Sequence, residues 1–380
     1  MSRSTAACTM AVLACAVAAP AAQAGPSSPT TAIVALGDSY ISGEAGRWEG
    51  NSNNQFAGRD GTDRAYVGGC CSYDTSRVYL GGSDDNGCHR SDVAEILSNT
   101  IGVGEKVNLA CSGATTANVI RASQGGQSHD GEAPQADQLA PVAQRDAVKL
   151  IVLSIGGNDL GFADIIQECV TDWTTSSADD PEYCYDDQQP QVDARMPGAM
   201  AAVGNATDEI RAVMADAGYA PSDYRFVLQS YPSPVPRGAE ARYPESGWSR
   251  LTTGGCPFWN RDLDWARDSL VAQISDNLRS VAAGRGLEFL DLRDTLQSRE
   301  VCATAASLSD GSPSPTTSEW TRFLVSGAGQ GDLQESFHPN AYAERGLGRC
   351  LTLVWSASPG RFACRNTPGQ SYTAMTLAPS

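Results

Sequence analysis

The chain has 380 residues, which is enough for one large domain or two. Its 44 acidic and 27 basic residues give a formal net charge of -17, and the lysines are Lys106 and Lys149 alone. Because nucleic acids bind to clustered Lys and Arg, this composition excludes a nucleic-acid partner, and it disfavours electrostatic docking on anionic membranes.

Residues 1–24 have the features of a signal peptide. Arg3 precedes the apolar run TAACTMAVLACAVAAP, and the small-residue motif AQA ends at Ala24, where we expect cleavage. Lipoprotein-type processing at Cys15 is the alternative, but it would truncate the apolar run. No later segment approaches the roughly 18 continuous apolar residues of a membrane span. We therefore expect a secreted, extracellular protein with no integral membrane segment after cleavage.

Five apolar segments predict buried strands, and amphipathic segments between them predict helices. The strands are expected at 32–36, 106–110, 148–154, 225–230 and 287–292, and the helices at 91–99, 135–146, 160–169, 196–217 and 263–282. This alternation predicts an α/β fold whose five-stranded parallel sheet is covered on both faces. We expect a single domain over 25–365 and an irregular C-terminal tail over 366–380. The stretches 42–90 and 170–195 are expected to be long loops.

Ten cysteines remain after removal of the signal peptide, which carries Cys8 and Cys15. An even number of cysteines in an exported protein predicts disulfides. Short loops favour Cys169 with Cys184 and Cys350 with Cys364, and a longer loop favours Cys256 with Cys302. The four others, Cys70, Cys71, Cys88 and Cys111, would pair among themselves, although the sequence does not fix the connectivity. No spacing matches a zinc site or a calcium loop, so we predict no metal and no other cofactor.

Polar residues follow the first three predicted strands. Ser39 lies in GDSY after the first strand, Gly113 lies in ACSGATT after the second, and Asn158 lies in GGND after the third. Parallel strands bring their carboxyl ends to one edge of a sheet, so a hydroxyl, a backbone amide and a side-chain amide should converge there. Acyl transfer needs such a nucleophile with fixed donors for an oxyanion.

A serine nucleophile needs a base within hydrogen-bond reach. The candidates are the three histidines His89, His129 and His338. His89 lies beside an expected disulfide, and His129 lies in a polar loop. His338 lies in ESFHPN after the fifth strand, where a final loop could return to the same edge. We therefore predict that His338 is the base.

The motifs GDSY, ACSGATT, GGND and HPN, in this order at strand ends, resemble blocks of the SGNH (GDSL-type) hydrolase superfamily. The resemblance spans nearly all of residues 32–345, and CHRS, YPSPVP and the cysteines are similar to those of secreted bacterial esterases, lipases and phospholipases. It implies a three-layer, flavodoxin-like fold and a serine carboxylester hydrolase that works through an acyl-enzyme intermediate. Ser39 would be the nucleophile and His338 the general base. The Ser39 N–H, the Gly113 N–H and the Asn158 amide would form the oxyanion hole.

The chain departs from the family pattern at one position. The family commonly has Asp three residues before the histidine, and this chain has Glu335. We predict that the Glu335 carboxylate orients His338, with a backbone carbonyl as the alternative.

The expected substrate is a small-molecule or lipid ester, cleaved by an esterase or lipase, or by a phospholipase. Several residues could line an acyl groove, namely Tyr40, Trp48, Tyr231, Trp259 and Phe337. The alternative activity is that of a carbohydrate acetyl esterase, a polysaccharide deacetylase of the same superfamily. A non-catalytic secreted binding protein is a further alternative. We expect a monomer.

Overall fold

The computed structural model describes Met1 and residues 30–69, 72–325 and 330–380. The predicted signal peptide from residue 2 onward, and the predicted disulfide residues Cys70 and Cys71, lie outside the described residues.

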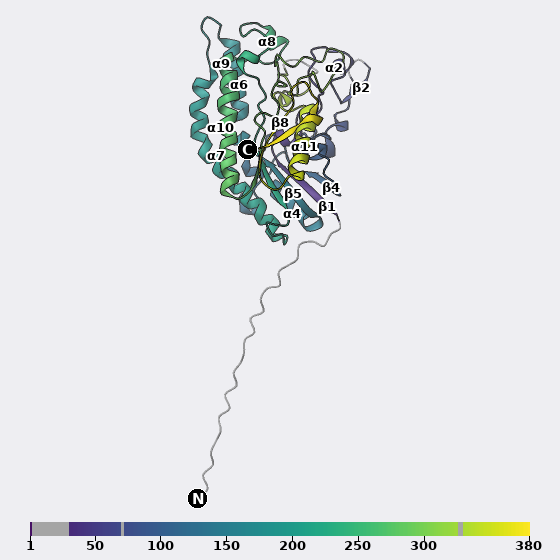
Figure 1. The fold of residues 1–380 in the computed structure, drawn as a ribbon, viewed down its shortest axis with the longest axis vertical. Coiled ribbons are helices and arrows are strands. Elements are labelled where there is room, and N and C mark those ends of the chain that lie inside the picture. Colours follow the sequence, from purple (N-terminus) through teal and green to yellow (C-terminus); the bar gives the residue numbers. More distant parts are fainter. Residues whose placement is uncertain (2–29, 70–71, 326–329) are drawn as a thin grey trace.

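A seven-stranded sheet, in the order β4-β1-β5-β6-β7-β8-β9, forms the middle of the molecule (Figure 1). Neighbouring strands run parallel except for the final pair, in which β9 is antiparallel to β8. The strands are β1 (Thr31–Gly37), β4 (Glu105–Asn108), β5 (Ala147–Ser154), β6 (Arg225–Gln229), β7 (Glu288–Asp291), β8 (Arg361–Arg365) and β9 (Thr376–Pro379). The predicted α/β class with a parallel sheet is therefore confirmed, with two more strands than expected.

Successive residues of a strand point to opposite faces, which divides the core into two layers. In β1, Val34 and Leu36 join one hydrophobic cluster, whereas Ile33 and Ala35 join the other. The two clusters explain why the central strands are apolar throughout, as expected for a parallel sheet covered on both sides.

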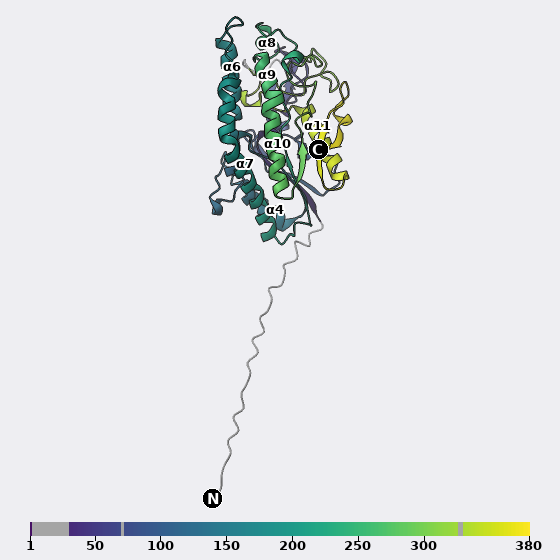
Figure 2. The same cartoon turned by 60° about the vertical axis from the view of Figure 1, so that its left-hand side comes forward.

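Helices cover both faces of the sheet, as Figure 2 shows. One face carries α4 (Gln135–Arg145), α6 (Phe162–Thr175), α7 (Cys184–Asp216) and α10 (Val271–Gly284), and the other carries α3 (Glu95–Ser98) and α11 (Ala341–Ser356). The shorter helices are α1 (Ser39–Ser42), α2 (Ala57–Asp60), α5 (Gly157–Leu160), α8 (Ser249–Thr252) and α9 (Asn260–Trp265), which runs through a π turn at 266–270 into α10. A small second sheet pairs β2 (Tyr66–Gly68) with β3 (Ser72–Tyr73). No helix in the described part of the chain is both long and apolar enough to cross a membrane.

Two expectations about irregular segments differ from the structure. The segment 366–380 is not an irregular tail, because β9 pairs with β8 and the side chains of Met375 and Leu377 pack on the second core cluster. The stretch 170–195 is mostly helical, since α6 extends to Thr175 and α7 begins at Cys184. Pro190 lies inside α7. Because a proline normally interrupts a helix, the sequence pattern did not predict the first turns of α7.

Four disulfides join described residues: Cys88–Cys111, Cys169–Cys184, Cys256–Cys302 and Cys350–Cys364. Three of them are the pairs that the loop lengths favour. Cys169–Cys184 joins the middle of α6 to the start of α7, and Cys350–Cys364 joins α11 to β8.

Candidate active site

The turns after β1, β4 and β5 meet at one edge of the sheet, because β1 lies between the other two strands. The Asp38 N–H donates to the Ser154 carbonyl at 3.0 Å, and the Cys111 N–H donates to the Gly37 carbonyl at 3.1 Å. Gly37 has φ +140, and a Cβ there would lie 1.9 Å from the Ser154 carbonyl oxygen. Only glycine allows the turn after β1 to approach the end of β5 so closely.

Ser39 is the first residue of α1, which begins directly after this turn. The Asp38 carboxylate caps the helix by accepting from the Tyr40 N–H at 3.1 Å. The cap fixes the direction in which the helix leaves the strand, and it places the Ser39 side chain over the edge of the sheet.

His338 lies within hydrogen-bond reach of Ser39 although 299 positions separate the two residues. Its Nε2 lies 2.7 Å from the Ser39 Oγ, and its Nδ1 lies 3.1 Å from the Ser336 carbonyl oxygen. A carbonyl can only accept, so Nδ1 carries the proton and Nε2 presents its lone pair to the hydroxyl. This tautomer can take the hydroxyl proton.

Burial lowers the pKa of His338 below its ordinary value of 6.5, although the Glu44 carboxylate acts in the opposite direction. A base must be neutral to accept a proton, so activity should rise as the pH rises through this lowered pKa. We expect kcat/KM for an ester to reach half of its plateau below pH 6.5. A pH–rate profile over pH 4.5–9 measures the midpoint, and a midpoint clearly above 6.5 would contradict this assignment.

Glu335 does not orient His338, which corrects the prediction from the sequence. Its carboxylate accepts from Trp48 Nε1 at 2.8 Å, from the Tyr79 hydroxyl at 2.7 Å and from the Asp332 N–H at 3.0 Å. Glu335 and Asp332 form a capping box around a 3₁₀ turn, Leu333–Glu335, and this turn directs the carboxylate away from the imidazole. The carbonyl of Ser336 takes the orienting role, as in the alternative considered above.

The Glu335→Gln variant separates a bracing role from an orienting one. Burial raises the pKa of Glu335 to about 7, although the charges of Arg322 and Arg47 act in the opposite direction. The Glu335 carboxylate offers two acceptor oxygens to its three donors, whereas a glutamine side chain would offer only one. We expect a loss of about 1–3 kcal/mol in the free energy of unfolding. The pH midpoint of kcat/KM should stay within about 0.3 unit, since the His338 partners are unchanged. Denaturant unfolding and the pH–rate profile test both, and a shifted midpoint with unchanged stability would restore the original prediction.

The two predicted oxyanion residues of the other turns lie close together. The Asn158 side-chain amide donates to the Ala114 carbonyl at 2.9 Å, directly after Gly113. The next residue, Asp159, braces the same turn by accepting from the Thr116 N–H at 3.0 Å and hydroxyl at 2.5 Å. The turns that carry Gly113 and Asn158 are therefore joined directly, beside the β1 turn.

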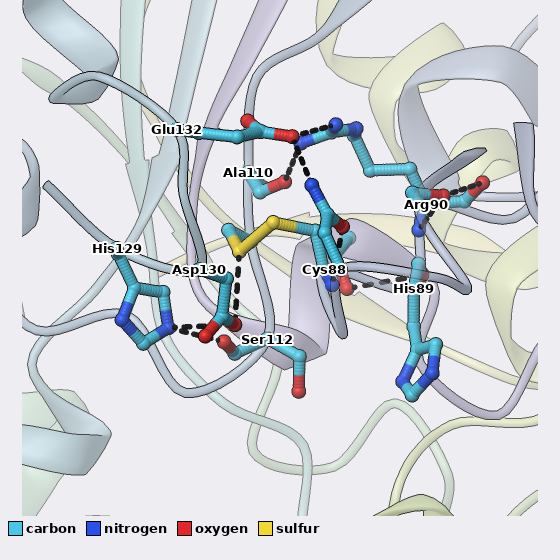
Figure 3. The surroundings of a disulfide bond; sticks show 12 residues. Cys88, His89, Arg90, Ala110, Ser112, His129, Asp130 and Glu132 are labelled. Atoms are coloured by element: carbon cyan, nitrogen blue, oxygen red, sulfur yellow. Dashed lines mark hydrogen bonds and ion pairs between the residues drawn. A yellow bond between two sulfur atoms is a disulfide. The ribbon is translucent and has the colours of Figure 1, made fainter. Parts of the chain in front are cut away.

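The Gly113 turn is also held by a disulfide and a histidine (Figure 3). Cys88–Cys111 fixes the end of β4, and His129 Nε2 lies 2.7 Å from the Ser112 carbonyl oxygen. Gly113 has φ +77, and a Cβ there would lie 3.2 Å from His129 Nε2. His129 is therefore a neighbour of the Gly113 turn, and within the described residues it makes no hydrogen bond to Ser39.

Tyr231 is a site residue whose role sequence reasoning missed. Its hydroxyl donates to the Asp38 carboxylate at 2.5 Å and accepts from the Gly157 N–H at 3.0 Å, so it joins the β1 and β5 turns. Burial raises the pKa of Asp38 to about 7, and the Tyr231 hydrogen bond opposes that rise. The signal was available, because Tyr231 follows β6 closely in the motif YPSPVP and β6 is the next strand of the sheet.

An apolar groove opens beside the Ser39–His338 pair. Its lining residues include Tyr40, Phe162, Ile165, Ile166, Tyr231, Pro232, Pro234, Val235, Phe258, Leu263, Leu270, Val271 and Phe337. Of the aromatic residues expected in an acyl groove, Tyr40, Tyr231 and Phe337 are in this lining. The other two have structural roles instead, since Trp48 Nε1 donates to Glu335 and Trp259 Nε1 donates to the Ser176 hydroxyl at 3.2 Å.

Comparison with protein families agrees with this geometry. The model of the GDSL-like lipase/acylhydrolase family matches residues 35–345, a region that contains Ser39, Gly113, Asn158 and His338. The chain belongs to this family. The resemblance to SGNH (GDSL-type) hydrolases seen in the sequence is confirmed, and the family's enzyme class, carboxylic ester hydrolase, is the one predicted.

Similar proteins occur in Streptomyces. Lipase 1 of Streptomyces coelicolor is 25% identical over 241 residues, which cover 62% of this chain and 65% of that protein, so the match spans just under two-thirds of the relative. The crystal structure of phospholipase A1 from Streptomyces albidoflavus superposes with a TM-score of 0.51 at 21% identity and covers 86% of this chain and 100% of that one, which shows the family fold. An extracellular lipase from Streptomyces rimosus has a TM-score of 0.45 at 21% identity, with the same coverage of both chains.

Proposed function

We propose that this protein hydrolyses carboxylic esters of long-chain acyl groups, with Ser39 as nucleophile and His338 as general base. The observation that carries the proposal is the apolar groove beginning at Tyr40 and Phe337, the neighbours of these two residues in the chain. The groove has about 60 Å³ of free volume, so its lining side chains must move apart to admit a long acyl chain. Each methylene group that they then remove from water contributes about 0.8 kcal/mol.

In the first step, the Ser39 Oγ attacks the ester carbonyl carbon while its proton moves to His338 Nε2. The imidazolium that forms keeps its Nδ1–H bond to the Ser336 carbonyl. The carbonyl oxygen becomes an oxyanion, for which the N–H groups of Ser39 and Gly113 and the Asn158 side-chain amide are the proposed donors. These donors are held in place before the substrate binds, so no free energy is spent on ordering them during the reaction.

In the second step, His338 gives the proton to the leaving alkoxide as the bond between the carbonyl carbon and the alcohol oxygen breaks. The acyl group stays on the Ser39 Oγ, and the alcohol departs. His338, neutral again, takes a proton from a water molecule that attacks the acyl-enzyme, and collapse of the second tetrahedral intermediate returns the proton to Ser39 and releases the acid.

Chain-length preference separates the proposal from the carbohydrate acetyl esterase alternative. On p-nitrophenyl esters from acetate to palmitate, the groove predicts higher kcat/KM for acyl chains of eight or more carbons, and cleavage of phosphatidylcholine or triacylglycerol would identify the natural ester. Hydrolysis of the acetate alone would favour the deacetylase.

The Ile166→Trp variant tests the groove itself. Ile166 is half-buried in α6, so an indole ring at this position would fill the groove without overpacking the core. We expect at least a tenfold loss in kcat/KM for the decanoate and less than a threefold change for the acetate. Ile166→Leu is the matched control and should leave both values nearly unchanged. Equal losses on the two esters would mean that the acyl chain lies elsewhere.

We also infer that the protein acts outside the cell as a monomer. The four disulfides support export, because such bonds persist in oxidising compartments. Mass analysis of the protein in culture medium would reveal the processed N-terminus, and size-exclusion chromatography would report the oligomeric state.

A further inference from the structure

A cluster of three metal-ligating side chains lies behind the catalytic histidine loop. Asp84 and His89 come from the loop that follows β3, and Asp332 comes from the residue that precedes the Leu333–Glu335 turn. One ligand atom from each residue lies within 4.8 Å of the other two. The three residues therefore bring two carboxylates and one imidazole to a single point from segments far apart in the chain.

His89 is held as a metal-binding histidine usually is. Its side chain is buried, and its Nδ1 lies 2.7 Å from a carboxylate oxygen of Glu44, which is fully buried. Gln334 Nε2 lies 2.9 Å from the same nitrogen but can only donate, so it does not accept the proton that Nδ1 gives to the Glu44 carboxylate. When the ring carries its single proton on Nδ1, Nε2 presents a lone pair to the cluster. This carboxylate–histidine arrangement fixes the tautomer and ring orientation that a metal ion requires.

Nε2 of His89 has no hydrogen-bond partner among the residues that the structure describes. The nearest carboxylate oxygen, from Asp84, lies 3.8 Å away, which is beyond a hydrogen bond. The 3.8 Å between His89 Nε2 and the Asp84 oxygen is consistent with an ion between them, since metal–ligand bonds of about 2.0–2.2 Å place ligand atoms roughly 3–4 Å apart.

We propose that Asp84, His89 and Asp332 bind a divalent transition-metal ion of the zinc type. An imidazole nitrogen with two carboxylates suits zinc and its neighbours, whereas calcium and magnesium prefer ligand sets made of oxygen alone. The dipositive ion balances the two carboxylates, and water completes its coordination. Asp332 is exposed and Asp84 is half-buried, so both can move the few tenths of an ångström that coordination needs.

The position of the site gives it a structural role. Asp332 opens the short turn that leads through Ser336 to His338, and Asp84 belongs to the loop that carries His89. An ion at this point ties the two loops together and holds the turn on which the base is mounted. It takes no part in the bond-making steps, because Ser39 and His338 lie outside the cluster.

Zinc titration of the chelator-treated full chain tests the proposal. We expect calorimetry to show one zinc ion bound per chain, and the thermal midpoint to rise by about 3 °C or more at a hundredfold excess of zinc over its dissociation constant. Asp84→Asn and Asp332→Asn should each weaken binding roughly tenfold or more. Asparagine keeps the hydrogen bond from Thr75 in the first variant and the helix cap in the second.

Asp85→Asn is the matched control, since Asp85 is an exposed neighbouring carboxylate outside the cluster. It should bind zinc as the natural sequence does. Absence of zinc binding in the natural sequence would overturn the proposal in favour of a simple ion pair between His89 and Asp84. Equal weakening by all three variants would also overturn it, because it would indicate binding to diffuse surface charge.

Discussion

Replacing Ser39 by alanine is expected to lower kcat for a p-nitrophenyl ester by on the order of 10⁴- to 10⁶-fold. The variant removes the nucleophile, which is the hydroxyl that lies 2.7 Å from His338 Nε2. His338→Ala should cause a loss of the same order, because an unactivated serine hydroxyl is a weak nucleophile at its ordinary pKa. The residual rate would come from the oxyanion donors and from binding alone.

The double variant carries the sharper part of this prediction. Residues that act as one unit are strongly non-additive, so Ser39→Ala combined with His338→Ala should be no slower than the worse single variant. Ser42→Ala is the matched control, since Ser42 is a buried serine in the same helix whose hydroxyl donates to the Ser39 carbonyl at 3.2 Å. It should keep most of the activity. Losses that multiply in the double variant would mean that the two residues act independently.

Replacing Asn158 by alanine is expected to lower kcat by roughly 10²- to 10³-fold with little change in KM. The amide is proposed to bind the oxyanion, a charge that exists in the transition state and not in the bound ester. Single-turnover kinetics with a decanoate ester would assign the loss to the acylation step.

A structural effect of the same substitution must be separated from the catalytic one. Asn158 also donates to the Ala114 carbonyl, so Asn158→Ala should lower the free energy of unfolding by about 1 kcal/mol. Asn118→Ala gives a comparison, since Asn118 is a buried amide in a neighbouring turn that bonds to Thr115. It should destabilise the protein at least as much, because the Asn118 side chain makes three hydrogen bonds, with a rate loss below about tenfold. Equal rate losses in the two variants would remove Asn158 from the oxyanion hole.

The residues at the strand ends could be predicted because their positions follow from the topology. A parallel sheet brings Ser39, Gly113 and Asn158 to one edge whatever the lengths of the connections between the strands. His338 could be predicted because it was the histidine outside the disulfide region and the polar loop. The same rule, extended to β6, would have indicated Tyr231 as a further site residue.

Glu335 could not be placed by the same reasoning, because its spacing to His338 has two structural outcomes. In an extended segment its side chain could reach the imidazole, whereas in a 3₁₀ turn it folds back onto the start of the turn. The pattern Asp332-x-x-Glu335 is a capping-box signature and would have favoured the second outcome. The strand β9 was concealed for a related reason, because its pairing with β8 and the packing of Met375 are long-range contacts that a short polar segment does not reveal.

Covalent labelling by a fluorophosphonate tests the central claim, that His338 activates Ser39, most directly. We expect one adduct per chain by intact mass, located on Ser39 by peptide mapping, absent in Ser39→Ala and at least a hundredfold slower to form in His338→Ala. Folded protein that forms no adduct would favour a secreted binding protein, and an adduct on another serine would mean that Ser39 is not the nucleophile.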